Sequence, residues 1–197
     1  MAGCDVPNPC SPDRQKVVRA AFIEAKAWLP HVQRQVAAYI NAPGKKKSRP
    51  VAKALKKHFD WTEKIREQVT FSDAPRIVVA QINLLLTKID IPPFNANCLS
   101  SGVTGQPDLS EIAAEVQSDQ IGTNCFSYTP AFFDPKKTSP KGRVTIVIHE
   151  MLHSWAGMPR DIAYEGKRDY PPRVGNAIEN PASFAGLIRD LRPRSKH

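Results

Sequence analysis

Apolar residues recur every three or four positions through the first half of the chain, which is the spacing that places them on one face of a helix. The first such stripe runs from Arg14 to Ile40. Its apolar members are Val18, Phe22, Ala25, Leu29, Val32, Val36 and Ile40. Because Pro30 has no amide hydrogen to donate within a helix, we expect a kink or a break at Leu29.

Two further helices are expected before residue 90. The same period returns from Val51 to Val69, after a polar, Lys-rich loop at residues 41–50, and predicts a second helix. A third helix has Ala74-Pro75 in its first turn, where proline is tolerated, and extends to Leu86.

Regular structure is interrupted after residue 89 by prolines, glycines and small polar residues. Short strands or a hairpin are expected at Ile112–Gln117 and Ile121–Tyr128, although Leu109–Gln117 also suits a helical turn. With 197 residues and no internal repeat, the chain is expected to form a single domain over residues 1–197, in which residues 1–12 are loosely ordered.

The most apolar helix is predicted to start after Ser139, a good N-cap residue, with Pro140 in its first turn. Its apolar residues surround nearly the whole helix, which favours burial, and Gly157 and Pro159 are expected to end it. We therefore predict an α+β, mainly helical domain with a small β element and this helix at its centre.

This buried helix carries His149, Glu150 and His153 in the pattern His-Glu-x-x-His. Residues four apart share one face of a helix, so both imidazoles can bind one metal ion, and zinc suits nitrogen ligands. Glu150 is offset by one position, outside the ligand set but within reach of the attacking water as its general base. The alternative is that all three are core residues, but burying such polar groups without a cation is costly. We therefore predict a zinc-dependent hydrolase.

A third ligand is required, because catalytic zinc sites usually combine three protein ligands with one open position. No third histidine follows except the terminal His197, which excludes the three-histidine class. The acidic candidates downstream are Asp161, Glu165, Asp169, Glu179 and Asp190. Their spacing leaves Asp161 and Glu179 as rivals, and Asp161 also suits a helix cap.

The stretch HEMLHSWAGMPRDIAYEG resembles the aspzincins, the deuterolysin and peptidyl-lysine metallopeptidase family. In that family HExxH is followed by Gly-Thr-x-Asp-x-x-Tyr-Gly. Asp161 and Tyr164 keep the Asp-x-x-Tyr spacing, while Met158-Pro159 stands in place of Gly-Thr and Glu165 separates Tyr164 from Gly166. The segments TNCFSYTPAFFDP and NAIENPASFAGLI also resemble family segments before and after the site.

The resemblance implies a zincin-like metallopeptidase fold and assigns the remaining roles. It implies that Asp161 is the third zinc ligand, beside His149 and His153. It also implies that the hydroxyl of Tyr164 stabilises the oxyanion of the transition state, although Tyr164 also suits an ordinary surface position.

The net charge of +9 is partly concentrated in a basic run from Gly44 to His58. Such a run binds polyanions or simply forms a solvated helix face. No aromatic residues interleave with its lysines to stack on bases, so nucleic acid is not an expected partner.

Four cysteines are present, at positions 4, 10, 98 and 125, and none forms a CxxC pair. Spacing suggests a local Cys4–Cys10 disulfide and a Cys98–Cys125 link, with four reduced, buried thiols as the alternative.

These features predict a zinc metallopeptidase that cleaves peptide bonds in a protein or peptide substrate. No apolar run reaches the roughly 18 residues of a membrane span, and no signal peptide is recognisable. A small basic protease of this kind suits a secreted bacterial effector or toxin, cytoplasmic before export, with secretion machinery and an immunity or inhibitor protein as partners. The alternatives are a zinc amidase acting on cell-wall peptides and a non-catalytic polyanion-binding protein on a metalloprotease scaffold.

Overall fold

The computed structural model describes most of the chain in seven stretches: residues 9–42, 47–62, 73–89, 95–99, 114–115, 125–158 and 161–194. The chain divides into two compact units, each made from two stretches of sequence. Unit 1 comprises Met1–Ala25 and Lys88–Pro159, and unit 2 comprises Lys26–Thr87 and Arg160–His197. The single domain expected over residues 1–197 stays a prediction, and most of the segment expected to be loosely ordered lies outside the described residues.

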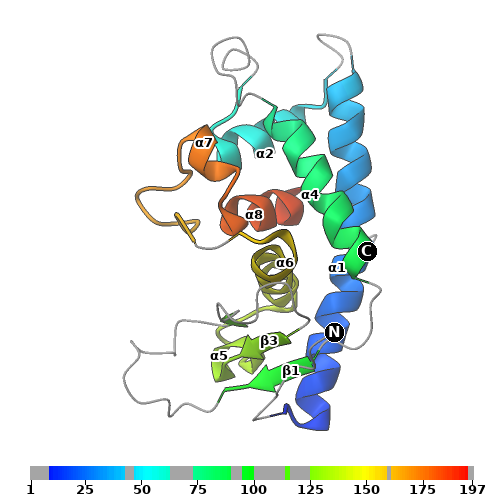
Figure 1. Ribbon diagram of the computed structural model, residues 1–197, viewed down its shortest axis with the longest axis vertical. Coiled ribbons are helices and arrows are strands. Elements are labelled where there is room, and N and C mark those ends of the chain that lie inside the picture. Colours follow the sequence, from blue (N-terminus) through cyan, green and yellow to red (C-terminus); the bar gives the residue numbers. More distant parts are fainter. Residues whose placement is uncertain are drawn as a thin grey trace. The chain divides into compact units, whose positions relative to one another are not determined.

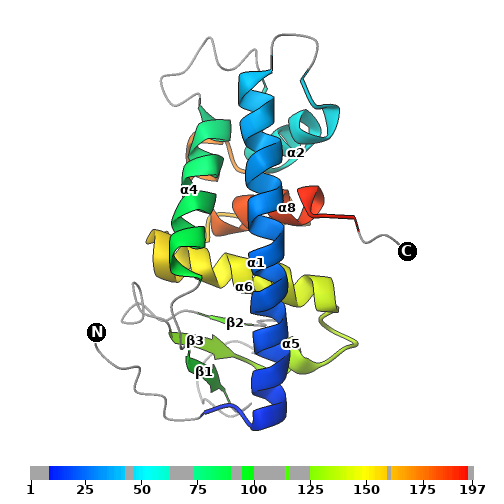
Figure 2. The ribbon, with the colours of Figure 1, turned by 90° about the vertical axis from the view of Figure 1, so that its right-hand side faces the viewer.

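Helix α1 spans Pro12–Asn41 and continues through Pro30 without interruption (Figure 2). The break expected at Leu29 is therefore wrong. Proline removes one backbone hydrogen bond, at a cost of about 3 kcal/mol. Leu29, Val32 and Val36 are fully buried on either side of it. Burying each such side chain contributes about 1.5–3 kcal/mol, which offsets that loss.

A three-stranded sheet lies in unit 1, in the order β1-β3-β2 (Figure 2). Strand β1 spans Asn95–Cys98, β2 spans Ala114–Glu115 and β3 spans Cys125–Tyr128. The two strands expected from the sequence, β2 and β3, pair antiparallel, with Ala114 opposite Tyr128. Strand β1 pairs parallel to β3 and was not expected, because its sequence Asn-Ala-Asn-Cys lacks the β-branched and aromatic residues that favour strands.

The cysteine pairing differs from both expected pairs, because Cys10 forms its disulfide with Cys98, with an S–S distance of 2.12 Å. Each cysteine forms a single disulfide, so Cys4–Cys10 and Cys98–Cys125 are both wrong. The backbone explains the pairing: Pro9 forms an antiparallel bridge with Asn97, and the Cys10 amide donates to the Ala96 carbonyl at 3.2 Å. The disulfide therefore fastens the start of the described chain to β1.

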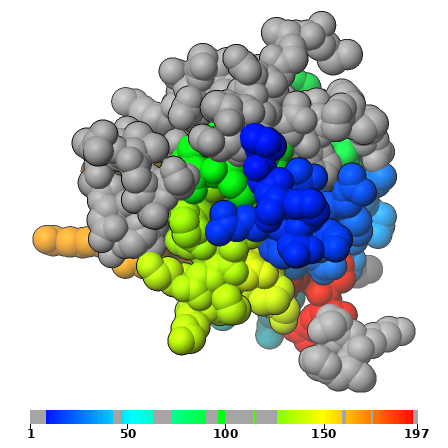
Figure 3. Space-filling model, turned by 90° about the horizontal axis from the view of Figure 1, so that it is seen from below, coloured from blue at the N-terminus to red at the C-terminus, as the bar shows by residue number. Residues whose placement is uncertain are grey.

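Two helices follow β3 in unit 1, α5 at Pro130–Phe133 and α6 at Pro140–Ala156. The bounds of α6 confirm the expected caps. The Ser139 hydroxyl accepts a hydrogen bond from the Gly142 amide at 3.1 Å, and Gly157 adopts the left-handed conformation, with φ of 66°. The start of α1 and α5 share one face of the unit (Figure 3), where the Arg14 guanidinium lies 4.9 Å from the centre of the Phe133 ring.

An aromatic cluster joins three elements of unit 1. Phe22 of α1, Phe126 of β3 and Trp155 of α6 have ring centres 5.4–6.5 Å apart. All three are buried, and tilted or edge-to-face contacts at this spacing add to the energy of burying the rings. The cluster thereby packs α6 against α1 and β3 through Trp155.

Unit 2 contains α2 at Arg49–Phe59, α4 at Ala74–Lys88, α7 at Val174–Ala177 and α8 at Pro181–Leu191. The last residue of α4, Lys88, belongs to unit 1. The start of α4 confirms the prediction that Ala74-Pro75 lies in the first turn of this helix. Helices α2 and α8 pack together (Figure 1), and the rings of Phe59 and Phe184 meet edge to face at 4.9 Å.

The second helix is shorter than expected. It ends at Phe59, because Asp60 takes the left-handed conformation, with φ of 47°, and its amide donates to the Leu55 carbonyl. Aspartate is among the few residues other than glycine that adopt this conformation readily. Residues 63–69 of the expected helix lie outside the described residues. No helix in the described part of the chain has both the length and the hydropathy of a membrane span.

Candidate metal centre and active site

Helix α6 places the two histidines of the HExxH pattern on one face, as their spacing requires. Both side chains are half-buried, and the two ring centres lie 4.9 Å apart. Their Nε2 atoms approach to 3.1 Å. Two ring nitrogens this close can act as ligands of one metal ion.

His153 is oriented by a backbone carbonyl just beyond the helix. Its Nδ1 lies 2.7 Å from the carbonyl oxygen of Met158. Because a carbonyl only accepts hydrogen bonds, Nδ1 carries the proton and donates it, which leaves the lone pair on Nε2. A hydrogen bond from the remote ring nitrogen is the usual support of a metal-binding histidine. The sequence did not indicate that the Met158 carbonyl orients His153, although Gly157 indicated that the helix ends there.

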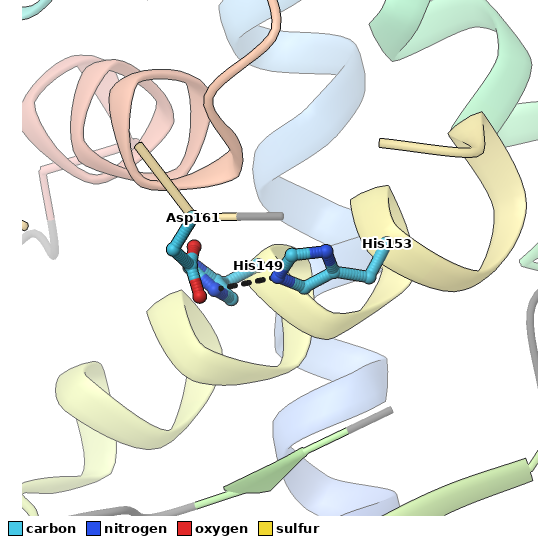
Figure 4. Close-up of side chains that lie close together, drawn as sticks. All are labelled: His149, His153 and Asp161. Carbon is cyan, nitrogen blue, oxygen red and sulfur yellow. Dashed lines mark hydrogen bonds between the residues drawn. The ribbon is translucent and has the colours of Figure 1, made fainter. Parts of the chain in front are cut away.

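Asp161 joins the two histidines, and one ligand atom from each of the three residues lies within 4.8 Å of the others (Figure 4). Two imidazole nitrogens and a carboxylate oxygen form a donor set that suits zinc. The residues present therefore fit a zinc ion. Among the described residues Glu179, the rival candidate, is not part of this group, and it lies exposed in the turn after α7.

Tyr164 contacts the same carboxylate. Its hydroxyl donates a hydrogen bond to Oδ2 of Asp161, three residues earlier. The side chain is 51% exposed, which is unusual for so large a ring. The phenol is therefore accessible from solvent and directed at a candidate metal ligand.

The Asp161 segment is fastened by Asn180, a residue that sequence reasoning did not single out. The Asn180 side chain accepts from the Ile162 amide at 3.1 Å and donates to the Ala163 carbonyl at 2.9 Å. It is fully buried and also donates to the Ser183 hydroxyl at 3.0 Å. Its position before Pro181, at the start of α8, was the available signal, because asparagine is a favoured N-cap.

Glu150 lies on the inner side of α6, and only 5% of it is exposed. Its neighbourhood includes Tyr128 of β3, which is fully buried. Burial, and after it the charge of Glu150, raises the pKa of Tyr128 well above its ordinary value. The carboxylate of Glu150, the residue that follows His149, is therefore shielded from solvent.

Two other acidic candidates, Glu165 and Asp190, belong to an ion-pair network in unit 2. Lys57 Nζ lies 2.8 Å from Oε1 of Glu165 and 2.8 Å from Oδ2 of Asp190. Arg189 bridges the same two carboxylates, at 2.7 and 2.9 Å. Their hydrogen-bonding capacity is used in joining α2, α8 and the segment after Tyr164. The remaining candidate, Asp169, is exposed.

No protein-family model matches this chain, and no curated protein matches its sequence. Among solved structures, a zinc peptidase from Grifola frondosa is similar, with a TM-score of 0.61 over 91% of this chain and 96% of that one. The chain shares the fold of that structure. Sequence identity is 14%, so the likeness shows the fold alone. It is consistent with the mainly helical architecture with a small sheet that the sequence predicted.

Proposed function

We propose that this chain is a zinc-dependent endopeptidase whose metal ligands are His149, His153 and Asp161. The convergence of these three donors within 4.8 Å carries the proposal. The similarity of this fold to that of a zinc peptidase supports the proposal independently, because it compares the arrangement of the backbone and does not depend on these side chains.

The donor set explains what each ligand contributes. Nε2 of His149 and Nε2 of His153 would hold the ion from one rigid helix face, and the Asp161 carboxylate would complete the set from the following segment. Three protein ligands leave a further position open, as catalytic sites require. The three residues would hold a zinc ion, which would supply Lewis-acid chemistry toward the scissile carbonyl and the attacking water.

Glu150 acts as general base and then as general acid in this proposal. It follows His149 directly, so its carboxylate is excluded from the ligand set yet lies next to it. The buried carboxylate accepts the proton of the attacking water and later delivers it to the leaving amine.

Tyr164 stabilises the oxyanion that forms when the scissile carbonyl is attacked. Its hydroxyl already points at Asp161, and half of the ring is open to solvent, where a substrate can reach it. A hydrogen-bond donor beside the site acts mainly in the transition state, because negative charge develops on the carbonyl oxygen only then.

A secreted or delivered effector is the proposed setting. The Cys10–Cys98 disulfide supports it, because disulfides persist in oxidising compartments and are rare in the cytosol. The proposed partners are a protein or peptide substrate, secretion machinery, and an immunity or inhibitor protein.

A peptide-library digest tests the proposed function. The zinc-loaded protein should cleave internal peptide bonds, should lose this activity with a chelator and should regain it when zinc is added back. Cleavage restricted to cell-wall peptides would instead indicate a zinc amidase with the same metal centre. Digestion that continues undiminished in excess chelator would contradict the proposal.

A further inference from the structure

A basic depression of about 660 Å³ lies on unit 2, between one side of α2 and the C-terminal end of α8 with the residues that follow it. Its charged lining comprises Arg49, Lys53, Lys57, Asp190, Arg192 and Arg194. The basic run noted in the sequence thus supplies one wall through α2, and the C-terminal residues supply the other. The proposed peptidase chemistry uses none of these side chains.

The depression carries five cationic side chains and a single carboxylate. Lys57 and Asp190 neutralise each other at 2.8 Å. Arg49, Lys53 and Arg194 are exposed, and no carboxylate of the described residues forms an ion pair with them. Like charges gathered around one hollow repel one another, and an anion bound between them removes that repulsion.

Two of the cationic groups are held in place before any ligand arrives. The Arg192 guanidinium lies 5.7 Å from the centre of the Trp28 ring and donates to the Arg189 carbonyl. Lys57 is fixed by its two carboxylates, Glu165 and Asp190. Side chains that are already ordered lose less conformational entropy on binding, which favours affinity for a matching anion.

We propose that this depression binds a soluble small molecule that carries several clustered phosphate groups. Arginine forks match phosphate oxygens in pairs, and three of the five cations are arginines. The volume falls within the range of about 300–1,000 Å³ that is typical of small-molecule sites. The lining contains no aromatic side chain, so it offers no surface on which a nucleobase would stack. The inference does not depend on the proposed peptidase activity.

Calorimetric titration with inorganic triphosphate tests the proposal on the full chain. The test variant is Arg49→Gln, Lys53→Gln and Arg194→Gln, three exposed positions in the lining. The matched control is Arg19→Gln, Arg34→Gln and Lys141→Gln, which removes the same charge from exposed positions outside it. We expect saturable binding of about one triphosphate per chain, at least about tenfold weaker in the test variant and unchanged in the control. Circular-dichroism melting of both variants checks that they fold.

Three results would overturn the proposal. Equal weakening in both variants would mean that only net charge attracts the anion. A protein that does not bind triphosphate could still bind vesicles that contain a phosphoinositide. If the test variant loses that vesicle binding, the depression recognises the phosphates of a lipid headgroup instead of a soluble molecule. Binding of duplex DNA without binding of triphosphate would make the surface a nucleic-acid site.

Discussion

His149 and His153 converge for a reason that the sequence already contains, since residues four apart on a helix must share a face. The hydrogen bonds that hold the site's side chains and backbone in place do not follow from this spacing. The carbonyl of Met158 and the side chain of Asn180 act through backbone directions that are set only once the chain has turned after α6. The sequence therefore predicts which side chains could bind a metal, whereas the hydrogen bonds that orient them depend on the folded backbone.

Glu150→Gln tests the general base directly. Glutamine has nearly the same shape in a site that is 5% exposed, but its amide cannot take a proton from water. We expect turnover to fall about 10²–10⁴-fold, with zinc content and melting temperature near those of the wild type. Initial rates on a cleaved peptide measure the effect, and turnover within twofold of the wild type would mean that Glu150 is not the base.

Tyr164→Phe removes only the hydroxyl that contacts Asp161. Because the ring is half exposed, the loss of one surface hydroxyl should leave stability and zinc content unchanged. We expect turnover to fall about 10–1,000-fold through the loss of an oxyanion donor. A steady-state comparison separates the alternatives, since an unaltered kcat would make Tyr164 an ordinary surface residue.

At the level of elements, the helices with a clear apolar period start near the expected residues, although α2 ends early at Phe59, and the caps of α6 agree with the residues that predicted them. The misses have local causes. Strand β1 has no strand-like composition and exists because β3 offers it a partner. Helix α1 passes through Pro30 because its buried face outweighs one lost hydrogen bond. Propensity yields to tertiary packing in both cases.

The packing of α2 on α8 should be sensitive to a single methyl group. A Cβ atom added at Gly186 would lie 2.6 Å from both Cε1 and Nδ1 of His58, a fully buried ring held between Tyr170 and Asp190. We expect Gly186→Ala to lower the free energy of unfolding by about 1–3 kcal/mol, the usual range for overpacking.

Thermal melting measures this effect, with Gly175→Ala as the control. No atom lies within 4 Å of a Cβ added at Gly175, which also lies in a helix. For a chain of this size the melting temperature of Gly186→Ala should fall by about 3–10 °C, while the control stays near the wild type. Equal melting temperatures would show that α2 and α8 are not packed as described.

At the level of the whole molecule, contacts between distant parts of the sequence were the least predictable. Cys10 and Cys98 are 88 residues apart, and the pairing of Pro9 and Cys10 with β1 brings them together. His58 and Asp190 are 132 residues apart, and no local pattern marks them as partners. Such pairs follow from the folded topology, which a single sequence does not display.

The unit 2 network should make stability fall in acid. Burial raises the pKa of Asp190, but hydrogen bonds from Lys57, His58 and Arg189 more than offset it and hold the pKa well below its ordinary value. Burial also lowers the pKa of His58, against the hydrogen bond that its ring donates to the Asp190 carboxylate. The unfolded chain therefore takes up protons first, and stability should fall below about pH 6.5 through His58 and further below about pH 4 through Asp190.

Melting curves of Asp190→Asn between pH 7.5 and pH 3 measure the aspartate's share. We expect a lower melting temperature than the wild type at pH 7.5 and a smaller fall below pH 4, because this variant has no carboxylate to protonate there. Asp13→Asn is the control, since Asp13 forms only an exposed pair with Lys16. Parallel curves for wild type and Asp190→Asn would contradict the role given to Asp190.

The identity of the third zinc ligand tests the central claim most directly. Zinc titration of the metal-stripped wild type, Asp161→Ala and Glu179→Ala should give about one tightly bound zinc per chain for the wild type and for Glu179→Ala. Asp161→Ala should bind zinc at least about 100-fold more weakly, because it removes one of three ligands grouped within 4.8 Å. Loss of zinc in Glu179→Ala with retention in Asp161→Ala, or absence of tight zinc binding in the wild type, would contradict the account.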